Sequence, residues 1–72
     1  MNKYEPTYEK GREIRNELTD EIMIILGMRF DKEFADIVYK MQGKRYKFNI
    51  REIPETVIDR NIETGDYKLI EQ

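Results

Sequence analysis

Residues 36–51 carry the pattern that most constrains the fold. One assumption about a turn assigns nearly all their side chains to either an apolar or a polar face. A glycine in the first central position is typical of a two-residue hairpin turn, so Gly43 and Lys44 are the expected centre. Cross-strand partners share a face, and successive residues alternate between faces. One predicted face is apolar or aromatic: Ile37, Tyr39, Met41, Tyr46, Phe48 and Ile50. The other is polar and mostly basic: Asp36, Lys40, Gln42, Arg45, Lys47 and Arg51, with Val38 and Asn49 at its centre. A one-residue slip would mix the two faces, so the sequence predicts this register.

This register also decides how the aromatic residues of the stretch are interpreted. Tyr39, Tyr46 and Phe48 alternate with cations, a pattern that can indicate a surface for single-stranded nucleic acid. Such a surface needs rings and cations on the same side, whereas the predicted hairpin separates them. The sequence therefore favours the three rings as core and the cations as a solvated face.

Residues 8–26 show apolar residues at spacings of four and three, which is typical of an amphipathic helix. The stripe consists of Ile14, Leu18, Ile22, Ile25 and Leu26. Gly27 would end this helix in a left-handed conformation. Because Ile24 lies off the stripe, two interpretations stay open for residues 22–30. They form the end of the helix, which we prefer, or an isoleucine-rich strand.

The last third of the chain predicts a short helix and a strand. Pro54 suits the first helical position, and Val57, Ile58 and Ile62 follow at helical spacing, so a helix is expected over residues 54–63. Residues 66–70 are then a last strand at the edge of the hairpin. The predicted fold class is α+β: one long N-terminal helix packed on a small antiparallel sheet, in the order helix, strand, strand, short helix, strand. We expect a single domain over residues 1–72, with residues 1–6 as a flexible lead-in.

The composition argues against catalysis and against cofactor or metal binding. The chain has no His, Cys, Ser or Trp, so the usual nucleophiles, an imidazole base and zinc sites of Cys and His are excluded. Its four glycines are scattered, so no phosphate-binding loop is expected. The acidic residues do not follow calcium-loop spacing. The longest apolar run has five residues, against about 20 for a membrane span, and we expect a cytoplasmic protein.

Two surfaces are candidates for binding partners. A small chain without disulfides favours self-association, with a dimer as the first expectation. The candidate self-interface is the apolar run Ile22, Met23, Ile24, Ile25, Leu26 and Met28. The candidate partner surface is the basic hairpin face: Lys40, Lys44, Arg45, Lys47 and Arg51.

These observations lead to two hypotheses of function. The first is a non-enzymatic interaction module that binds another protein and self-associates. The second is an accessory nucleic-acid-binding protein that uses the basic hairpin face on the phosphate backbone. The sequence pI near 5.2 ranks the protein partner first, because dedicated nucleic-acid binders are usually basic.

Overall fold

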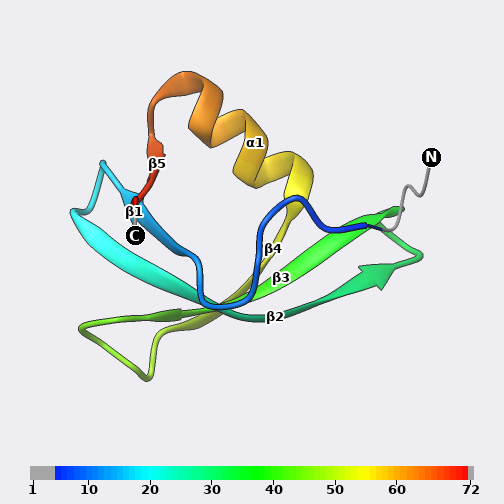
Figure 1. Ribbon diagram of the computed structural model, residues 1–72, viewed down its shortest axis with the longest axis horizontal. Coiled ribbons are helices and arrows are strands. Elements are labelled where there is room, and N and C mark those ends of the chain that lie inside the picture. The colour runs from blue at the N-terminus through cyan, green and yellow to red at the C-terminus, as the bar shows by residue number, and fades with distance from the viewer. Residues whose placement is uncertain (1–4, 72) are drawn as a thin grey trace.

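The computed structural model describes residues 5–71 and has a mainly β architecture. One antiparallel sheet of five strands is joined by one helix, which packs across one face of the sheet (Figure 1). The elements are β1 (Glu13–Asn16), β2 (Glu21–Asp31), β3 (Asp36–Gly43), β4 (Ile50–Pro54), α1 (Glu55–Thr64) and β5 (Tyr67–Leu69). Of the predicted flexible lead-in, residues 1–4 lie outside the described part of the chain.

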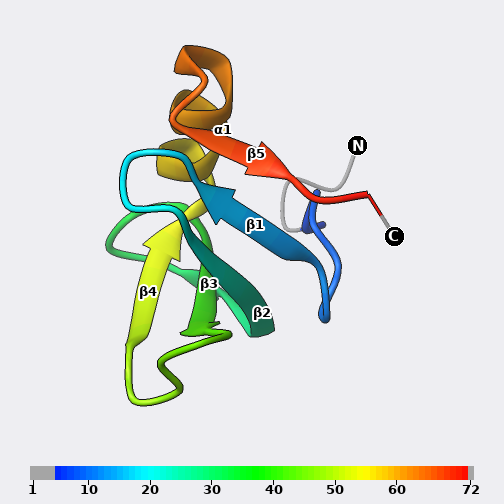
Figure 2. The same cartoon turned by 90° about the vertical axis from the view of Figure 1, so that its left-hand side faces the viewer.

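The strand order is β4-β3-β2-β1-β5, so the first four strands form a meander. After β4, α1 carries the chain back over the sheet, and β5 pairs with β1 at the opposite edge (Figure 2). The helix contacts β3, β4 and β5. The core lies between α1 and the sheet, and its buried cluster is Ile14, Met23, Ile25, Ile37, Tyr39, Met41, Ile53, Ile58 and Tyr67.

The predicted long N-terminal helix is wrong, and the α+β class is corrected to mainly β. Residues 13–31 form β1 and β2, so the strand interpretation of residues 22–30 is the one that holds. The turn between the strands begins at Asn16, whose side-chain oxygen accepts a hydrogen bond from the backbone N–H of Leu18. The ladder between β2 and β3 shifts between Ile25 and Gly27, so Leu26 is an extra residue. This bulge lets Ile25 and Met28 share the core face at a spacing of three, which imitates a helix.

The predicted hairpin is right in its first strand, but its second strand and its register are wrong. In the structure Tyr39 pairs with Ile53 and Gln42 pairs with Ile50, so residues 44–49 form a six-residue loop. Gly43 is buried, and a side-chain carbon there would lie 2.6 Å from the carbonyl oxygen of Tyr46. The glycine is therefore needed for the close approach of the loop rather than for the turn that the sequence predicts.

The short helix and the last strand are confirmed, at Glu55–Thr64 and Tyr67–Leu69. The last strand pairs with β1 and not with the edge of the hairpin. The side chain of Asp36, at the start of β3, accepts hydrogen bonds from the backbone N–H and the hydroxyl of Thr56 at 2.9 and 2.6 Å. Because Pro54 provides no side-chain cap, this contact satisfies a free donor of the first helical turn.

The hydroxyl of buried Tyr39 connects the N-terminal segment to the core by hydrogen bonds. The Tyr39 hydroxyl accepts hydrogen bonds from the backbone N–H groups of Thr7 and Tyr8 and donates one to Glu55 Oε1 at 2.5 Å. Burial raises the pKa of Tyr39 above its ordinary value, and its hydrogen bond to Glu55 adds to the rise. Tyr8 donates to Asp59 Oδ1, and burial together with that bond likewise raises its pKa.

Candidate functional site: an aromatic and basic loop beside a pocket

The loop at residues 44–49 projects two aromatic side chains into solvent. Phe48 is 85% exposed and Tyr46 is 49% exposed, so neither belongs to the core that the sequence predicted for them. Their ring centroids lie 5.9 Å apart with the planes tilted by 58°. The guanidinium carbon of Arg45 lies 5.4 Å from the Tyr46 ring centroid, which is a cation–π arrangement. Rings and cations therefore lie together on this loop.

The cations of the predicted partner surface are distributed over this end of the hairpin and its strands. Lys44 binds the carboxylate of Glu13 at 3.1 Å. The other four form no ion pair with any residue in the range 5–71: Lys40, Arg45, Lys47 and Arg51. Lys40 pairs across the strands with Glu52, whereas a turn centred on Gly43 and Lys44 would place it opposite Lys47.

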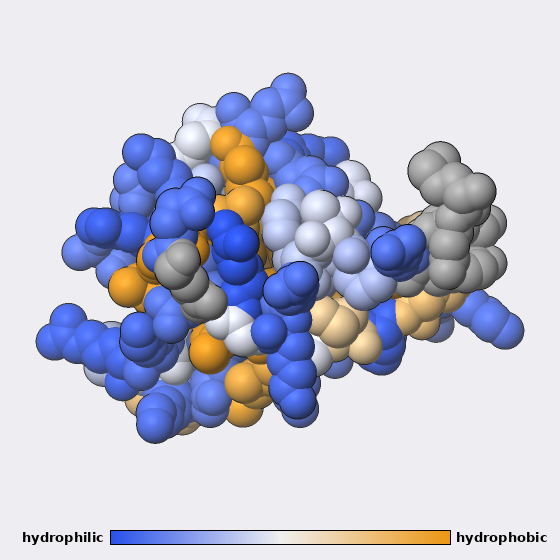
Figure 3. All heavy atoms as spheres, in the orientation of Figure 1, coloured by the Kyte–Doolittle hydropathy of each residue, from blue (hydrophilic) through white to orange (hydrophobic). Residues whose placement is uncertain are grey.

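Residues 37–51 contain five cations and no acidic residue, and the chain has a net charge of −2. The rest of the chain therefore carries seven more acidic than basic side chains. Figure 3 shows a largely hydrophilic face, with hydrophilic side chains projecting at the end where the β3–β4 loop lies. This separation gives the loop a local positive field within an acidic protein.

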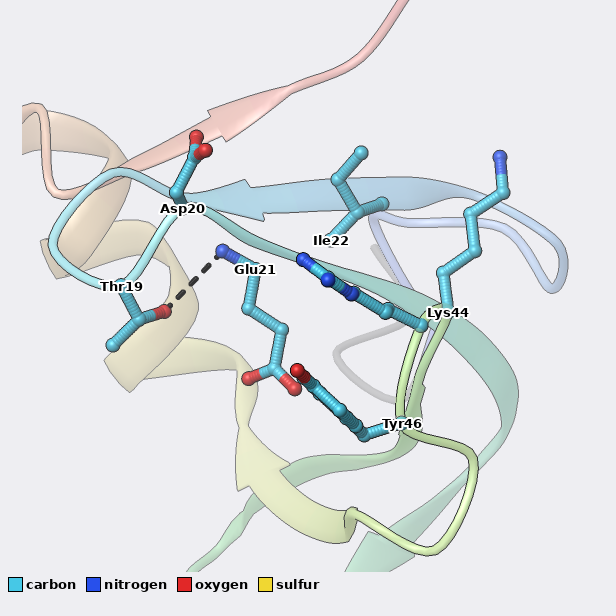
Figure 4. A pocket seen from close by; sticks show the side chains of 7 residues that line it. Thr19, Asp20, Glu21, Ile22, Lys44 and Tyr46 are labelled. Carbon is cyan, nitrogen blue, oxygen red and sulfur yellow. Dashed lines mark hydrogen bonds between the residues drawn. The ribbon is translucent and has the colours of Figure 1, made fainter.

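A pocket of about 360 Å³ lies between this loop and the turn that joins β1 to β2. Both segments lie at the same end of the sheet (Figure 1). The pocket is lined by Thr19, Asp20, Glu21, Ile22, Lys44, Arg45 and Tyr46. Figure 4 shows the side chains of Glu21 and Tyr46 directed toward the same space from opposite sides. The volume falls in the range of small-ligand sites.

Glu21 is the best positioned polar group of the pocket. Its Oε2 accepts a hydrogen bond from the Asn49 side chain at 2.8 Å, and its backbone N–H donates to the Thr19 hydroxyl (Figure 4). The same Oε2 lies beside Gly43, 3.0 Å from where a side-chain carbon would be. Glu21 Oε1 has no hydrogen-bond partner among residues 5–71. One carboxylate oxygen is thus held and the other is available.

Asp20 also lines the pocket, but its carboxylate is occupied. Arg15 donates to Asp20 Oδ1 and also forms an ion pair with Glu17 at 3.1 Å. Because the Asp20 and Glu17 carboxylates lie against it, the pKa of Arg15 is raised above its ordinary value, with the Asp20 hydrogen bond as the largest cause. Arg15 thus binds one oxygen of Asp20 and one of Glu17 within the turn, whereas Glu21 forms no ion pair within residues 5–71 and its side chain is directed into the pocket (Figure 4).

The residues of the predicted self-interface do not lie on one surface of the protein. Met23 and Ile25 are buried in the core, and half-buried Met28 packs against it. The remaining members of the run are half-buried: Ile22, Ile24 and Leu26. Since β2 is paired on both edges, only side chains on its outer face are free to contact a second molecule.

Sequence reasoning missed the exposed rings, the turn at residues 17–20 and the role of Glu21. The exposed rings depend on the register between β3 and β4, which determines whether Tyr46 and Phe48 belong to a strand or to a loop. The turn and Glu21 were missed because a helix was predicted over residues 8–26, where the structure has β1, a turn and β2. Asn16 and Asp20 do indicate a turn, and Asp20 adopts a positive φ of 62°.

Metal and membrane features were also sought in the described part of the chain. Within residues 5–71, no group of three His, Cys, Asp or Glu side chains is arranged to hold a metal ion. Nor does any helix there have the length and apolar character needed to cross a membrane. Comparison with protein-family models, curated proteins and solved structures finds no match to the chain, so the site is interpreted from its own geometry.

Proposed function

We propose that the protein is a binding module for single-stranded nucleic acid and that the β3–β4 loop is its contact surface. One observation carries this proposal: Tyr46 and Phe48 lie outside the core, on the same loop as Arg45 and Lys47, which form no ion pair within residues 5–71. Aromatic rings beside cations on one side of a protein are the combination that binds single strands.

The two components of the loop have separate roles. Phe48, with its ring almost fully in solvent, is a platform on which a base stacks, and such stacking is worth about 1–3 kcal/mol per base. Arg45 and Lys47 flank Tyr46 in sequence and supply positive charge to the phosphates. Because every base has an aromatic face, this mode of binding tolerates many sequences.

The net acidic charge of the residues outside 37–51 favours a small contact area between the protein and the strand. This net negative charge disfavours phosphate away from the loop, so a strand would contact the protein along one end of the sheet. If about three phosphates are neutralised, the logarithm of the binding constant should fall with the logarithm of salt concentration with a slope of about −2. The low overall pI is compatible with this local mode.

Fluorescence anisotropy of a labelled twelve-nucleotide oligothymidine tests the proposal. We expect binding at low salt that weakens steadily between about 50 and 200 mM salt. Phe48→Ala should weaken it about tenfold, which corresponds to about 1.4 kcal/mol within the stacking range. The matched control is Phe34→Ala, because Phe34 is 62% exposed in the turn between β2 and β3 and away from the loop.

Two charge-reversal variants distinguish the contribution of phosphate contacts from that of base stacking. Lys47→Glu should weaken binding and reduce the salt slope, whereas Lys32→Glu, an exposed lysine in the β2–β3 turn, should change both much less. Absence of binding at low salt would overturn the proposal, as would equal losses in the Phe34 and Phe48 variants.

The second candidate function is binding of protein, including a second copy of the chain. It is favoured by apolar side chains at the surface: Leu18 is 75% exposed in the β1–β2 turn, and Ile22 and Ile24 are half-buried in β2. Light scattering tests self-association, for which a dimer is the first expectation. Ile24→Glu should then convert the dimer to a monomer, and an unchanged mass would remove the outer face of β2 as the interface.

A further inference from the structure

We propose that the pocket between the β1–β2 turn and the β3–β4 loop receives one nucleobase of the bound strand and selects guanine. This inference rests on the proposed function, because it assigns base specificity to the same end of the sheet. The pocket adjoins the aromatic loop through Tyr46, which both lines it and contacts the ring of Phe48. A strand stacked on Phe48 therefore has an adjacent recess for a neighbouring base.

The recess is lined by an acceptor and a cationic donor. Glu21 is positioned by Asn49 at one oxygen and leaves the other available. Arg45 lines the same pocket and has no ion pair within residues 5–71, unlike Lys44, whose ammonium group binds Glu13. The site thus offers carboxylate acceptors beside a guanidinium.

Guanine presents the complementary edge. Its N1–H and N2–H groups are adjacent donors that suit a carboxylate, and its O6 is an acceptor that suits a guanidinium. Adenine presents one donor beside an acceptor, and thymine presents one donor between two acceptors. Each of these would set an acceptor against Glu21 or leave Arg45 without one, and an unpaired polar group in a recess carries a desolvation penalty.

Gly43 and Asn49 both lie next to the Glu21 carboxylate. A larger residue at position 43 would push against the Glu21 carboxylate, and the Asn49 amide fixes the orientation of that carboxylate. The loop that carries the stacking rings therefore also positions the acceptor. Base stacking and base selection are coupled through residues 43–49.

Competition anisotropy with oligothymidines that differ at one central position tests the inference. The central base is guanine, inosine, adenine or thymine, and a single guanine avoids self-assembly of guanine-rich strands. We expect the guanine strand to bind at least about tenfold more tightly than the thymine strand, as one bidentate contact would provide. Inosine lacks the N2 amino group, so its strand should lose most of this preference.

The decisive variant is Glu21→Gln, which keeps the size of the side chain and an oxygen for Asn49. It should abolish the preference for guanine, measured as the ratio of the affinities for the guanine and thymine strands. Asp20→Asn is the matched control, since Asp20 lines the pocket but its carboxylate is held by Arg15, and it should keep the preference.

The outcomes separate this inference from the proposed function. Equal affinity of the wild-type protein for all four strands would overturn the guanine site and leave single-strand binding standing. A guanine preference that survives in Glu21→Gln would overturn the role of the carboxylate. Absence of binding to every strand at low salt would overturn the proposed function and the guanine site together.

Discussion

Replacing Tyr39 with Phe removes one hydroxyl from the centre of the protein and tests whether the N-terminal segment belongs to the fold. The Tyr39 side chain is fully buried, and its hydroxyl makes three hydrogen bonds. In the variant, the Thr7 N–H keeps its 3.0 Å hydrogen bond to Glu55 Oε1. The Tyr8 N–H loses its partner, and Glu55 loses the donor that held it against the core.

The expected cost follows from these contacts. Three hydrogen bonds are lost, but the Thr7 N–H keeps its bond to Glu55, so the net loss is one bond to a charged acceptor and one to the Tyr8 N–H. The released Glu55 carboxylate recovers water. Taking about 1 kcal/mol for each bond, we expect the free energy of unfolding to fall by about 2 kcal/mol. A chain of 72 residues has a total stability of roughly 4–10 kcal/mol, so the loss should lower the melting temperature by about 10 °C.

Urea denaturation followed by circular dichroism measures this loss. The matched control is Tyr46→Phe, because the Tyr46 hydroxyl forms no hydrogen bond with any residue in the range 5–71. The control should change stability by less than about 0.5 kcal/mol, as is usual for surface substitutions. Equal midpoints for Tyr39→Phe and the wild-type protein would refute the contribution assigned to the buried hydroxyl.

The same variant has a signature at alkaline pH. Burial, reinforced by Glu55, raises the pKa of Tyr39 in the folded state, so the folded protein keeps a proton that the unfolded chain loses near pH 10. The resulting stability is fully present below that pH and declines as the pH rises above it. Tyr39→Phe should make the decline shallower, and a slope as steep as that of the wild-type protein would contradict this assignment.

Two further substitutions test contacts that position the helix and the loop. Asp36→Ala removes the acceptor of the Thr56 N–H and should cost about 1 kcal/mol by urea denaturation at neutral pH. Burial raises the pKa of Asp36, but the hydrogen bonds that its carboxylate accepts lower the pKa by more. The net result is a pKa below the ordinary value. The stability it contributes should therefore disappear as the pH falls below about 4, and the variant should show a weaker acid dependence. Gly43→Ala places a carbon 2.6 Å from the Tyr46 carbonyl oxygen and should cost about 1–3 kcal/mol, whereas Gly27→Ala meets no atom within 4 Å and should cost much less. Equal midpoints for the two glycine variants would contradict the close approach of the loop.

The parts of the fold that the sequence predicts are those with strong local signals. Pro54 before the helix and Gly65 after it bracket α1, and Gly65 adopts the left-handed φ of 88° that favours glycine. The spacing of Ile58 and Ile62 then places its apolar side toward the sheet. No tertiary information is needed for these assignments.

The long helix fails because two patterns coincide in residues 14–26. Of the predicted stripe, only Ile14 and Ile25 are buried in the core, at an odd interval that a strand, a turn and a second strand produce. Leu18 is 75% exposed in the turn, and Ile22 and Leu26 are half-buried in the second strand. Periodicity alone cannot separate that pattern from a helix. The isoleucine content of residues 22–25 favours a strand and is the sequence feature that distinguishes the two structures here.

The hairpin register fails for a reason outside the hairpin. Pairing Tyr39 with Phe48 and pairing it with Ile53 both place an apolar residue beside the ring. The second register brings Pro54 level with Val38, so α1 begins directly over the sheet and Asp36 reaches its first turn. Ile58 is then fully buried. Packing of the helix decides the register, and the sequence of the hairpin does not contain that information.

This choice of register has a functional consequence. Burying Ile53 beside Tyr39 leaves Phe48 in the loop, although burial of such a side chain is worth roughly 1.5–3 kcal/mol. One exposed ring is ordinary at a protein surface. Here the rings of Phe48 and Tyr46 lie with centroids 5.9 Å apart, on the same loop as two cations that form no ion pair within residues 5–71. The exposed position of Phe48 leaves this burial energy unused in the fold, and a ligand that covers the ring would recover it.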